Sequence, residues 1–176
     1  MPDPKEIAAE FTIREGTESD LPEVWALIKE LAIYEREPEA VVTTVESMRV
    51  DGFGENAVYG FFVAERDDKI VGMSLFYDRY STWRGRCLYL EDFVVTQECR
   101  RTGIGKALFD RTVRKAREEG YRGMTWQVLD WNEPALKFYA KYQSKIEDGW
   151  LNGSLSQAQL QETCLLYTSP SPRDRG

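Results

Sequence analysis

The sequence predicts a single α/β (α+β) domain whose sheet is antiparallel through its hairpins and parallel across one helical crossover. Strand-like and helix-like segments follow one another in the order β-α-α-β-β-β-α-β-α. The polar residues Arg66–Lys69 join two strand-like runs, which is typical of a hairpin. A later strand-like run passes through a glycine-containing turn into a helix and then a further strand, the order of a parallel crossover.

The amino-terminal segments predict one strand and one long helix. Phe11–Arg14 alternates apolar and polar residues, as a short strand does. Asp20 and Glu23 have the spacing of a capping box, and Pro22 suits the first turn of the helix that follows. Apolar residues recur at helical spacing until Tyr34–Pro38, where we expect this helix to end.

A second, shorter helix is expected to start at Thr43 or Thr44, since either hydroxyl can cap a helix. It runs through Met48 and closes at Asp51–Gly54, where glycines suit a helix end. The strand-like runs that come next cover residues 58–65, 70–80 and 88–96.

The segment between Gly105 and Gly120 predicts an amphipathic helix. Met124–Leu129 is a short apolar strand, and Asn132 with Pro134 suits the cap and first turn of one more helix. The predicted inward face of the amphipathic helix consists of Leu108, Phe109, Thr112, Val113 and Ala116.

The ends of the chain differ from its middle. We expect residues 1–10 to be flexible, residues 11–162 to form the domain, and residues 163–176 to be disordered because they are rich in Ser, Pro and Arg. The abrupt change in composition suggests a tail that is not native to the domain. The amino end lacks the basic and apolar parts of a secretory signal, and no apolar run could cross a bilayer, so a cytoplasmic protein without a membrane partner is expected.

Composition excludes several kinds of chemistry. The chain has 176 residues and no histidine, so triads and metal sites that need imidazole are excluded and no metal is expected. Its three cysteines form no paired motif, which fits reduced thiols. A formal net charge of -7 argues against a nucleic-acid partner and favours a cationic small molecule.

One turn has the features of a phosphate-binding site. Arg100-Arg101-Thr102-Gly103-Ile104-Gly105 follows a strand-like run and opens the amphipathic helix. Glycines allow close backbone approach to a pyrophosphate, and the arginines and the helix amino end attract its charge. The dinucleotide fingerprint is excluded because Leu108 stands where its third glycine is required. The alternative is a turn that needs glycine only to start a helix.

Five blocks of sequence together carry a family resemblance: Leu27–Glu35, Asp51–Gly54, Leu88–Val95, Arg100–Gly105 and Trp131–Tyr139. They resemble the GNAT superfamily of acyl-CoA-dependent N-acetyltransferases, and within it the diamine (spermidine/spermine) and thialysine acetyltransferases. The Leu88–Phe93 and Trp131–Pro134 blocks are more specific than the glycine turn. The resemblance implies helices on both faces of the sheet, a central pair of parallel strands that splay apart, and a homodimer.

The resemblance also implies that acetyl-CoA binds as co-substrate where these two strands separate. Main-chain groups of Phe93, Val94 and Val95 are expected to contact its pantetheine arm. The residues expected to cradle its pyrophosphate are Arg100, Arg101, Thr102, Gly103, Ile104, Gly105 and Lys106. Further cofactor contacts are expected from Asn132, Glu133, Pro134 and Ala135.

Two catalytic residues follow from the resemblance. Tyr139 is expected to protonate the departing thiolate, for which a phenol has a suitable pKa; the alternative is a core aromatic beside Phe138. Glu91 is expected to hold the amine and, through water, accept its proton. Substrate-lining positions are Tyr34, Glu35, Glu91, Thr125, Trp126, Gln127 and Asp148.

Glu91 and Asp92 are neighbours on a predicted strand, so their side chains are expected on opposite faces, with only one of them in a given cleft. A surface carboxylate at Glu91 and a hydrogen-bond acceptor that braces a loop at Asp92 are the structural alternatives.

The expected reaction is direct transfer of an acetyl group to a primary amine of a polyamine or a lysine-like molecule in a ternary complex. A covalent route through Cys87 or Cys99 lacks a histidine to activate the thiol. The other classes left open are a noncatalytic acyl-CoA or polyamine sensor and a protein lysine acetyltransferase.

Overall fold

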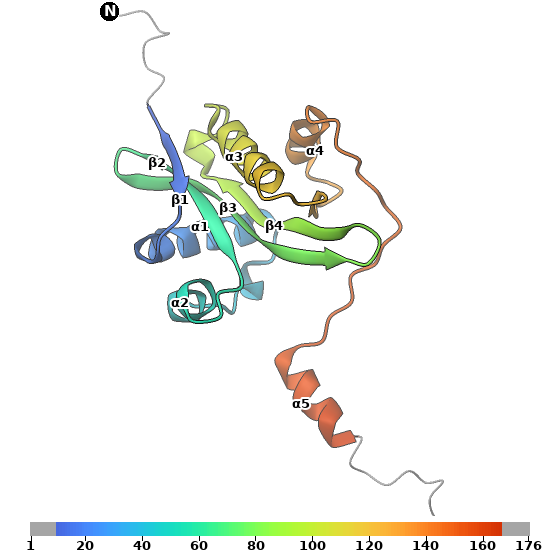
Figure 1. The fold of residues 1–176 in the computed structure, drawn as a ribbon. Coiled ribbons are helices and arrows are strands. Elements are labelled where there is room, and N and C mark those ends of the chain that lie inside the picture. The colour runs from blue at the N-terminus through green and yellow to red at the C-terminus, as the bar shows by residue number, and fades with distance from the viewer. Residues whose placement is uncertain (1–9, 167–176) are drawn as a thin grey trace, which may run out of the picture. The chain divides into compact units, whose positions relative to one another are not determined.

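The computed structural model describes residues 10–166, with side chains from residue 10 to residue 162. The chain divides after Leu129 into two compact units. The first unit contains one five-stranded sheet in the order β1-β2-β3-β4-β5 (Figure 1). The strands are β1 (Thr12–Glu15), β2 (Gly60–Arg66), β3 (Lys69–Ser81), β4 (Gly85–Val95) and β5 (Met124–Trp126).

The direction of each strand pair confirms the predicted mixed sheet. The pairs β1–β2, β2–β3 and β3–β4 are antiparallel, and β4–β5 is parallel. The parallel pair lies at the edge of the sheet that the structure describes, and not at its centre. β5 is also shorter than predicted, since it ends at Trp126.

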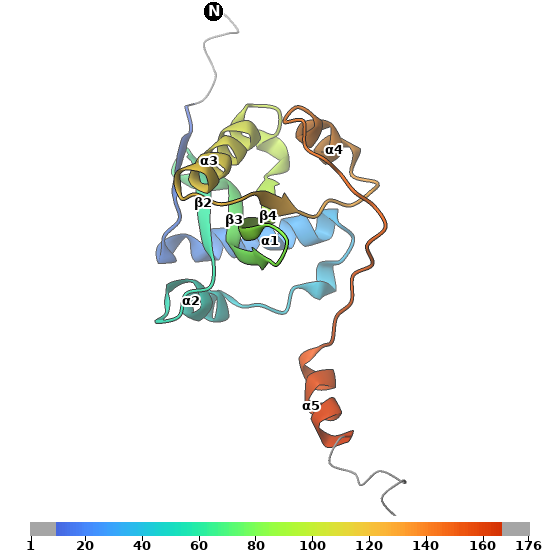
Figure 2. The same ribbon diagram turned by 45° about the vertical axis from the view of Figure 1, so that its right-hand side comes forward.

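Three helices of the first unit cover the two faces of this sheet. α1 (Leu21–Tyr34) and α2 (Val45–Phe53) lie on one face, and α3 (Ile104–Glu118) lies on the other (Figure 2). Short 3-10 turns precede α1 (Glu18–Asp20), separate α1 from α2 (Pro38–Ala40) and precede α3 (Gln97–Cys99).

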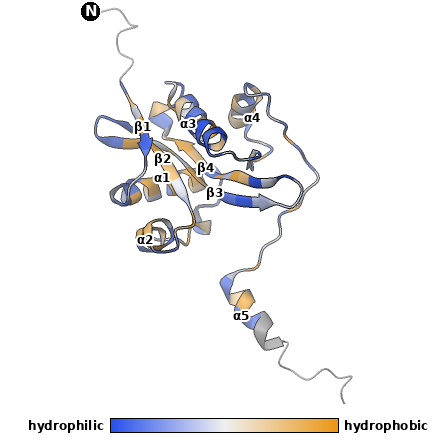
Figure 3. Ribbon diagram, viewed as in Figure 1, coloured by the Kyte–Doolittle hydropathy of each residue, from blue (hydrophilic) through white to orange (hydrophobic). Residues whose placement is uncertain are grey.

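Each face of the sheet has its own hydrophobic core. The α3 face includes Phe62, Phe76, Leu88 and Leu108, and its members are at most 9% exposed. The hydropathy colouring shows apolar strands between helices whose outer surfaces are polar (Figure 3). The buried cluster on the α1 face consists of Leu21, Val24, Leu27, Met48, Phe61, Val63, Ile70, Met73, Leu75 and Val94.

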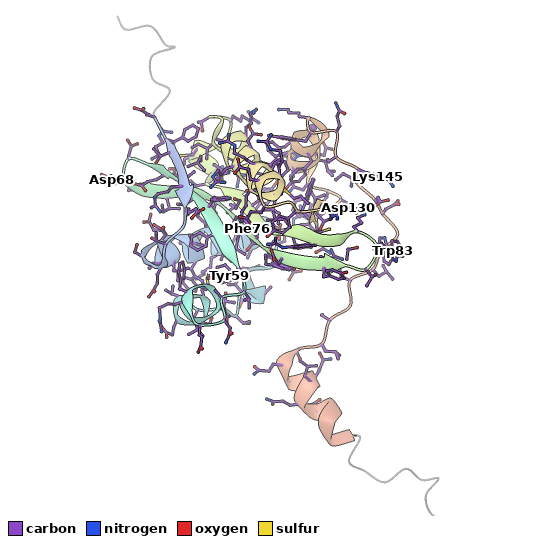
Figure 4. All side chains as sticks on the ribbon, viewed as in Figure 1. Tyr59, Asp68, Phe76, Trp83, Asp130 and Lys145 are labelled. Atoms are coloured by element: carbon purple, nitrogen blue, oxygen red, sulfur yellow. The ribbon has the colours of Figure 1, made fainter. Side chains whose placement is uncertain are left out.

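Two of the predicted local signals are confirmed. Asp67 and Asp68 have φ of 52° and 57°, and this tight turn joins β2 to β3 at the labelled Asp68 (Figure 4). Thr44 caps α2 by accepting a hydrogen bond from the Ser47 N–H at 3.1 Å. α2 itself continues to Phe53, further than predicted.

The predicted capping box at the start of α1 is wrong. Asp20 accepts two hydrogen bonds from Arg14, at 2.7 and 2.8 Å, and one from the Thr17 N–H at 2.7 Å. The Glu23 carboxylate instead accepts a hydrogen bond of 2.9 Å from the N–H of Ile70. The capping box instead joins Thr17 and Asp20, and the Asp20 carboxylate also pairs with Arg14, six residues before it.

The inward face of α3 is confirmed except at one position. Val113 is 40% exposed, whereas Ile104 at the helix start is completely buried. Thr112 is buried and shares a 2.9 Å hydrogen bond with Ser74 of β3, which fixes the helix on the sheet.

The second unit contains α4 (Glu133–Ala140) and α5 (Gln157–Leu166). Asn132 caps α4 as predicted, by accepting a hydrogen bond from the Ala135 N–H at 3.3 Å. Residues 1–9 and 167–176 of the predicted flexible ends lie outside the described residues. Within the part of the chain that the structure describes, no helix is long and apolar enough to cross a membrane.

Candidate active site

The site is built around an irregularity in β4. Leu75 of β3 pairs with Asp92, and the next residue, Phe76, pairs with Leu90, so Glu91 is an extra residue in a β-bulge. The bulge shifts the alternation of side chains, which places Asp92 opposite Leu75 on the α1 face. Glu91 and Asp92 both line a cavity on that face. The prediction that only one of them could face a given cleft is therefore wrong.

This cavity has a volume of about 490 Å³ and is formed mainly by the end of α1, the loop after it, α2 and β3. Its apolar walls include Ile28, Leu31, Met48 and Leu75, and none of the described residues that line it is a lysine or an arginine. An apolar channel with carboxylates suits a cation that carries a hydrocarbon chain. The carboxylates along it are Glu35, Glu37, Asp51, Glu91 and Asp92.

Three of these carboxylates influence one another. The pKa of Asp92 is raised to about 6 by burial and then by the charges of Glu91 and Glu35. Burial also raises the pKa of Glu35. None of the three forms an ion pair with a described residue. The cluster would therefore be stabilised by a bound cation.

Two tyrosines of the sheet lie beside Glu91. The rings of Tyr77 and Tyr89 stack with their centroids 5.1 Å apart. The pKa of each phenol is raised by burial and then by the negative charge of Glu91. This aromatic pair provides a flat apolar surface next to the bulge.

The far wall of the cavity is held by Tyr59, which is labelled in Figure 4. Its hydroxyl donates a hydrogen bond of 2.6 Å to the carbonyl of Met48 in α2. Burial and then the charge of Asp51 raise the pKa of this phenol to about 12. Glu37 and Asp51 were not among the predicted site residues, although Asp51 begins the Asp51–Gly54 block that carried the resemblance.

β4 has an open backbone edge beyond the bulge. Its pairing with β5 ends at Leu90 and Trp126, so residues 93–95 extend past the last paired residue of β5. The Phe93 ring packs at 5.8 Å from Phe109 on the α3 face. The pairing of the two parallel strands therefore ends before the predicted pantetheine segment, in which the Val95 carbonyl accepts a hydrogen bond of 3.0 Å from the Arg100 Nε.

The turn after β4 presents the amino end of α3. Gly103 is the N-cap residue with φ of 93°, Arg101 has φ of 67°, and no side chain caps the helix. The first turn has no acidic residue and carries Lys106. Helix N–H groups and the helix dipole thus meet where an anion could bind, while the Lys106 ammonium pairs with Asp110 one turn further along the helix.

Arg100 has a different environment from its neighbour Arg101. Its Nε donates a hydrogen bond of 3.0 Å to the carbonyl of Val95. Its guanidinium lies 3.9 Å from the Glu30 carboxylate and 5.1 Å from the centre of the Tyr34 ring. The side chain therefore contacts both β4 and α1.

The predicted substrate residues of β5 are not all on one face. Thr125 pairs with Tyr89, and its buried Oγ1 has no hydrogen-bond partner among the described residues. Trp126 packs edge-on against Phe109 of α3, with ring centres 5.6 Å apart, so its ring lies on the face opposite the cavity. Gln127 is exposed beyond the end of the strand.

The remaining predicted residues belong to the second unit. Tyr139 is 5% exposed, and its ring is 5.4 Å from that of Phe138. Its carbonyl accepts a hydrogen bond of 2.9 Å from Ser144. Asn132 to Ala135 form the cap and first turn of α4, and Asp148 is exposed in a segment without regular secondary structure.

Comparison with known proteins gives a consistent result. A family model described as "Acetyltransferase (GNAT) family" matches residues 21–143. Thialysine N-epsilon-acetyltransferase of Bos taurus is 39% identical over 72% of this chain and 79% of its own length. The protein of the same name from Mus musculus is 36% identical over 82% of this chain and 91% of its own length.

Two further similarities extend the comparison. Spermidine/spermine N(1)-acetyltransferase-like protein 1 of Homo sapiens is 34% identical over 80% of this chain but only 22% of its own length. Among solved structures, an aminoglycoside acetyltransferase from an uncultured soil metagenomic sample superposes with a TM-score of 0.68 at 23% identity. That match covers 86% of this chain and 99% of the other, and it supports the fold.

Proposed function

Because the chain belongs to the acetyltransferase (GNAT) family and is an N-acetyltransferase, we propose that it acetylates a polyamine or a lysine-like small amine with acetyl-CoA. The names of its relatives support amines of this type, since they act on thialysine or carry the name spermidine/spermine acetyltransferase. The proposed reaction is direct transfer within a ternary complex.

The observation that supports the substrate class is the cavity on the α1 face. Its five carboxylates are separated by apolar walls, and its lining contains no basic residue. A diamine or lysine side chain has ammonium and hydrocarbon parts that match this alternation. A neutral or anionic substrate would leave the cluster of Glu35, Glu91 and Asp92 without compensation.

The turn between β4 and α3 fits the pyrophosphate of acetyl-CoA. This placement is supported by the amino end of α3, the left-handed Gly103 and the basic residue Arg101, while the Lys106 ammonium pairs with Asp110. The open edge of β4 at Phe93 to Val95 would pair with the amide groups of pantetheine. Acetyl-CoA would supply the acetyl group as a thioester when bound between these elements.

The chain's own residues supply the proton transfers of the proposal. Glu91 would hold the ammonium group at the bulge and accept a proton from the amine through water. Asp92 and Glu35 add negative charge beside it. Tyr139 would donate its phenolic proton to the leaving sulfur.

The replacement Tyr139→Phe tests whether Tyr139 is the general acid that protonates the leaving thiolate. We expect turnover to fall on the order of a hundredfold, because the phenol proton is lost while the ring still packs. Acetyl-CoA affinity, measured by calorimetry, should stay within about threefold. Phe138→Leu serves as the control for packing in α4. An unchanged turnover number for Tyr139→Phe would remove this residue from the mechanism.

Replacement Glu91→Gln tests the amine site. The KM for a diamine should rise roughly tenfold, because an amide cannot compensate an ammonium charge. Steady-state kinetics with saturating acetyl-CoA measures this effect. The control is Glu46→Gln, which removes an exposed carboxylate that pairs with Arg49 on α2, outside the cavity. Equal KM values for the wild type and Glu91→Gln would place the amine elsewhere.

The amine itself is identified by thiol release from acetyl-CoA with putrescine, spermidine, spermine, thialysine, lysine and small primary amines. Release with polyamines or lysine-like amines supports the proposal. Tight acetyl-CoA binding without release across the panel would favour a sensor, and release only with a lysine-containing peptide would favour a protein acetyltransferase.

A further inference from the structure

Arg100 connects two parts of the molecule that have different roles in the proposed reaction. Its Nε donates a hydrogen bond of 3.0 Å to the carbonyl of Val95, on the strand edge assigned to acetyl-CoA. Through the rest of its guanidinium it lies 3.9 Å from Glu30 and 5.1 Å from the Tyr34 ring, both on α1. Its side chain thus bridges the end of β4 and the end of α1.

The end of α1 carries part of the amine cavity. Tyr34 is the last residue of the helix, and the following residue, Glu35, lines the cavity. Glu30 and Tyr34 are four residues apart and so lie on the same helix face. Glu30 also accepts a hydrogen bond of 3.1 Å from the Gln97 N–H. The segment from Gln97 to Arg100 therefore holds this helix end at two points.

We propose that Arg100 is a positioning residue for the amine, and that it acts by fixing the Tyr34–Glu35 end of α1 against the turn that starts the phosphate cradle. The inference depends on the proposed function, because it assigns the cavity to the amine and the turn to acetyl-CoA. Arg101, one residue later, lies in the cradle itself and has a left-handed backbone. The two adjacent arginines thus serve different substrates.

The chemistry of the three contacts requires a guanidinium. A planar fork can donate to a carbonyl with Nε, face a carboxylate with its terminal nitrogens and stack on an aromatic ring at the same time. A lysine ammonium is a point charge and would keep only the attraction to Glu30. Helix ends are less stable than helix interiors, so loss of the other two contacts would free Tyr34 and Glu35 first.

The test compares Arg100→Lys and Arg100→Met with the matched variant Arg101→Met. For both Arg100 variants we expect the diamine KM to rise roughly fivefold to tenfold, and the acetyl-CoA KM to rise less than it does in Arg101→Met. Arg101→Met should show the opposite pattern, with a higher acetyl-CoA KM and an unchanged diamine KM. A merely structural role for Arg100 would lower stability without separating the two KM values.

A double-mutant cycle identifies the path of the effect. If Arg100 acts through Tyr34, then Arg100→Met in a Tyr34→Leu background should raise the diamine KM by less than about twofold further. Full additivity of the two effects, or an acetyl-CoA KM that rises in place of the diamine KM, would overturn the proposal.

Failure of the proposed function can be distinguished from failure of this inference. Wild-type thiol release with the amine panel tests the function alone. Calorimetric titration of putrescine into the wild type and Arg100→Met needs no turnover. Weaker binding to the variant supports the inference, and equal affinities overturn it. If putrescine does not bind the wild type, the same comparison with thialysine decides, and binding of neither amine overturns both proposals.

Discussion

Asp92 determines how the proposed amine site should respond to pH. Its pKa is raised to about 6, first by burial and then by Glu91 and Glu35. Below this value the carboxyl group is largely neutral and attracts a cation weakly; above it the group is ionised. The amine must also lose a proton before it attacks, which alone gives log kcat/KM a slope near 1 with pH. We therefore expect a steeper slope below about pH 6 in the wild type.

The variant Asp92→Asn should remove this break near pH 6 and leave the shallower slope throughout, as a pH series of kcat/KM would show. If the break in the pH profile persists in Asp92→Asn, the break belongs to the titration of another group.

The raised pKa of Asp92 also makes the stability of the protein depend on pH. Because the native state holds this proton more tightly than the unfolded chain, unfolding free energy falls as pH rises from about 4 to about 6. Asp92→Asn should lack this fall in urea titrations.

Among the structural elements, the turn that starts α3 tolerates a side chain at one of its two glycines better than at the other. Gly103 has φ of 93° with open space around it, so Gly103→Ala brings backbone strain of about 1 kcal/mol without a clash. Gly105 lies inside the helix, where an added Cβ would meet Phe93 and Val95 at an ordinary 3.7 Å. Gly105→Ala should therefore be neutral or stabilising by up to about 1 kcal/mol.

Acetyl-CoA binding should follow the same order for these two variants. A Cβ at Gly103 would stand in open space at the amino end of α3, where a pyrophosphate would approach, so the acetyl-CoA Kd of Gly103→Ala should rise roughly tenfold. The Cβ of Gly105→Ala would face Phe93 and Val95, so the Kd of this control should stay within about twofold of the wild type. Chemical denaturation and calorimetry on the same samples measure both quantities. If Gly103→Ala binds acetyl-CoA like the wild type, the pyrophosphate does not lie at this turn.

Elements whose signals are local could be predicted from the sequence. The β2–β3 turn at Asp67 and Asp68, the Thr44 cap and most of the α3 face depend on neighbouring residues, and all three are present. Features that depend on distant residues could not be predicted in this way. Glu23, which was expected in the cap of α1, accepts a hydrogen bond from the N–H of Ile70, 47 residues later.

In the candidate site, too, the features with local signals could be predicted from the sequence, and those that depend on distant residues could not. The blocks around Glu91 and Gly103 are visible in the sequence, because motifs preserve residue type and spacing. The bulge that turns Glu91 and Asp92 to the same face comes from the register of β4 against β3, which no local pattern encodes. Glu37 and Asp51 reach the cavity only through the packing of α2 and the loop before it.

At the level of the whole molecule, stability is concentrated before residue 130. Both hydrophobic clusters consist of residues between Phe11 and Met124. By contrast, residues 157–162 of α5 are all exposed. Two local hydrogen bonds at its start join Ser156 and Gln159, at 2.8 and 3.3 Å. These observations predict that the residues after Glu162 contribute little to unfolding.

A chain that ends at Glu162 should therefore melt within about 2 °C of the full chain, since every described member of the two cores precedes the cut. It should also keep its acetyltransferase activity, because every residue assigned to the two substrates precedes the cut. Leu108→Ala provides the positive control: it empties a completely buried position of α3 and should cost about 2–5 kcal/mol. The measurement compares the melting temperatures of the full chain, the truncated chain and Leu108→Ala at one protein concentration. A fall of more than about 5 °C on truncation would mean that the carboxy-terminal residues pack against the domain and add to its core.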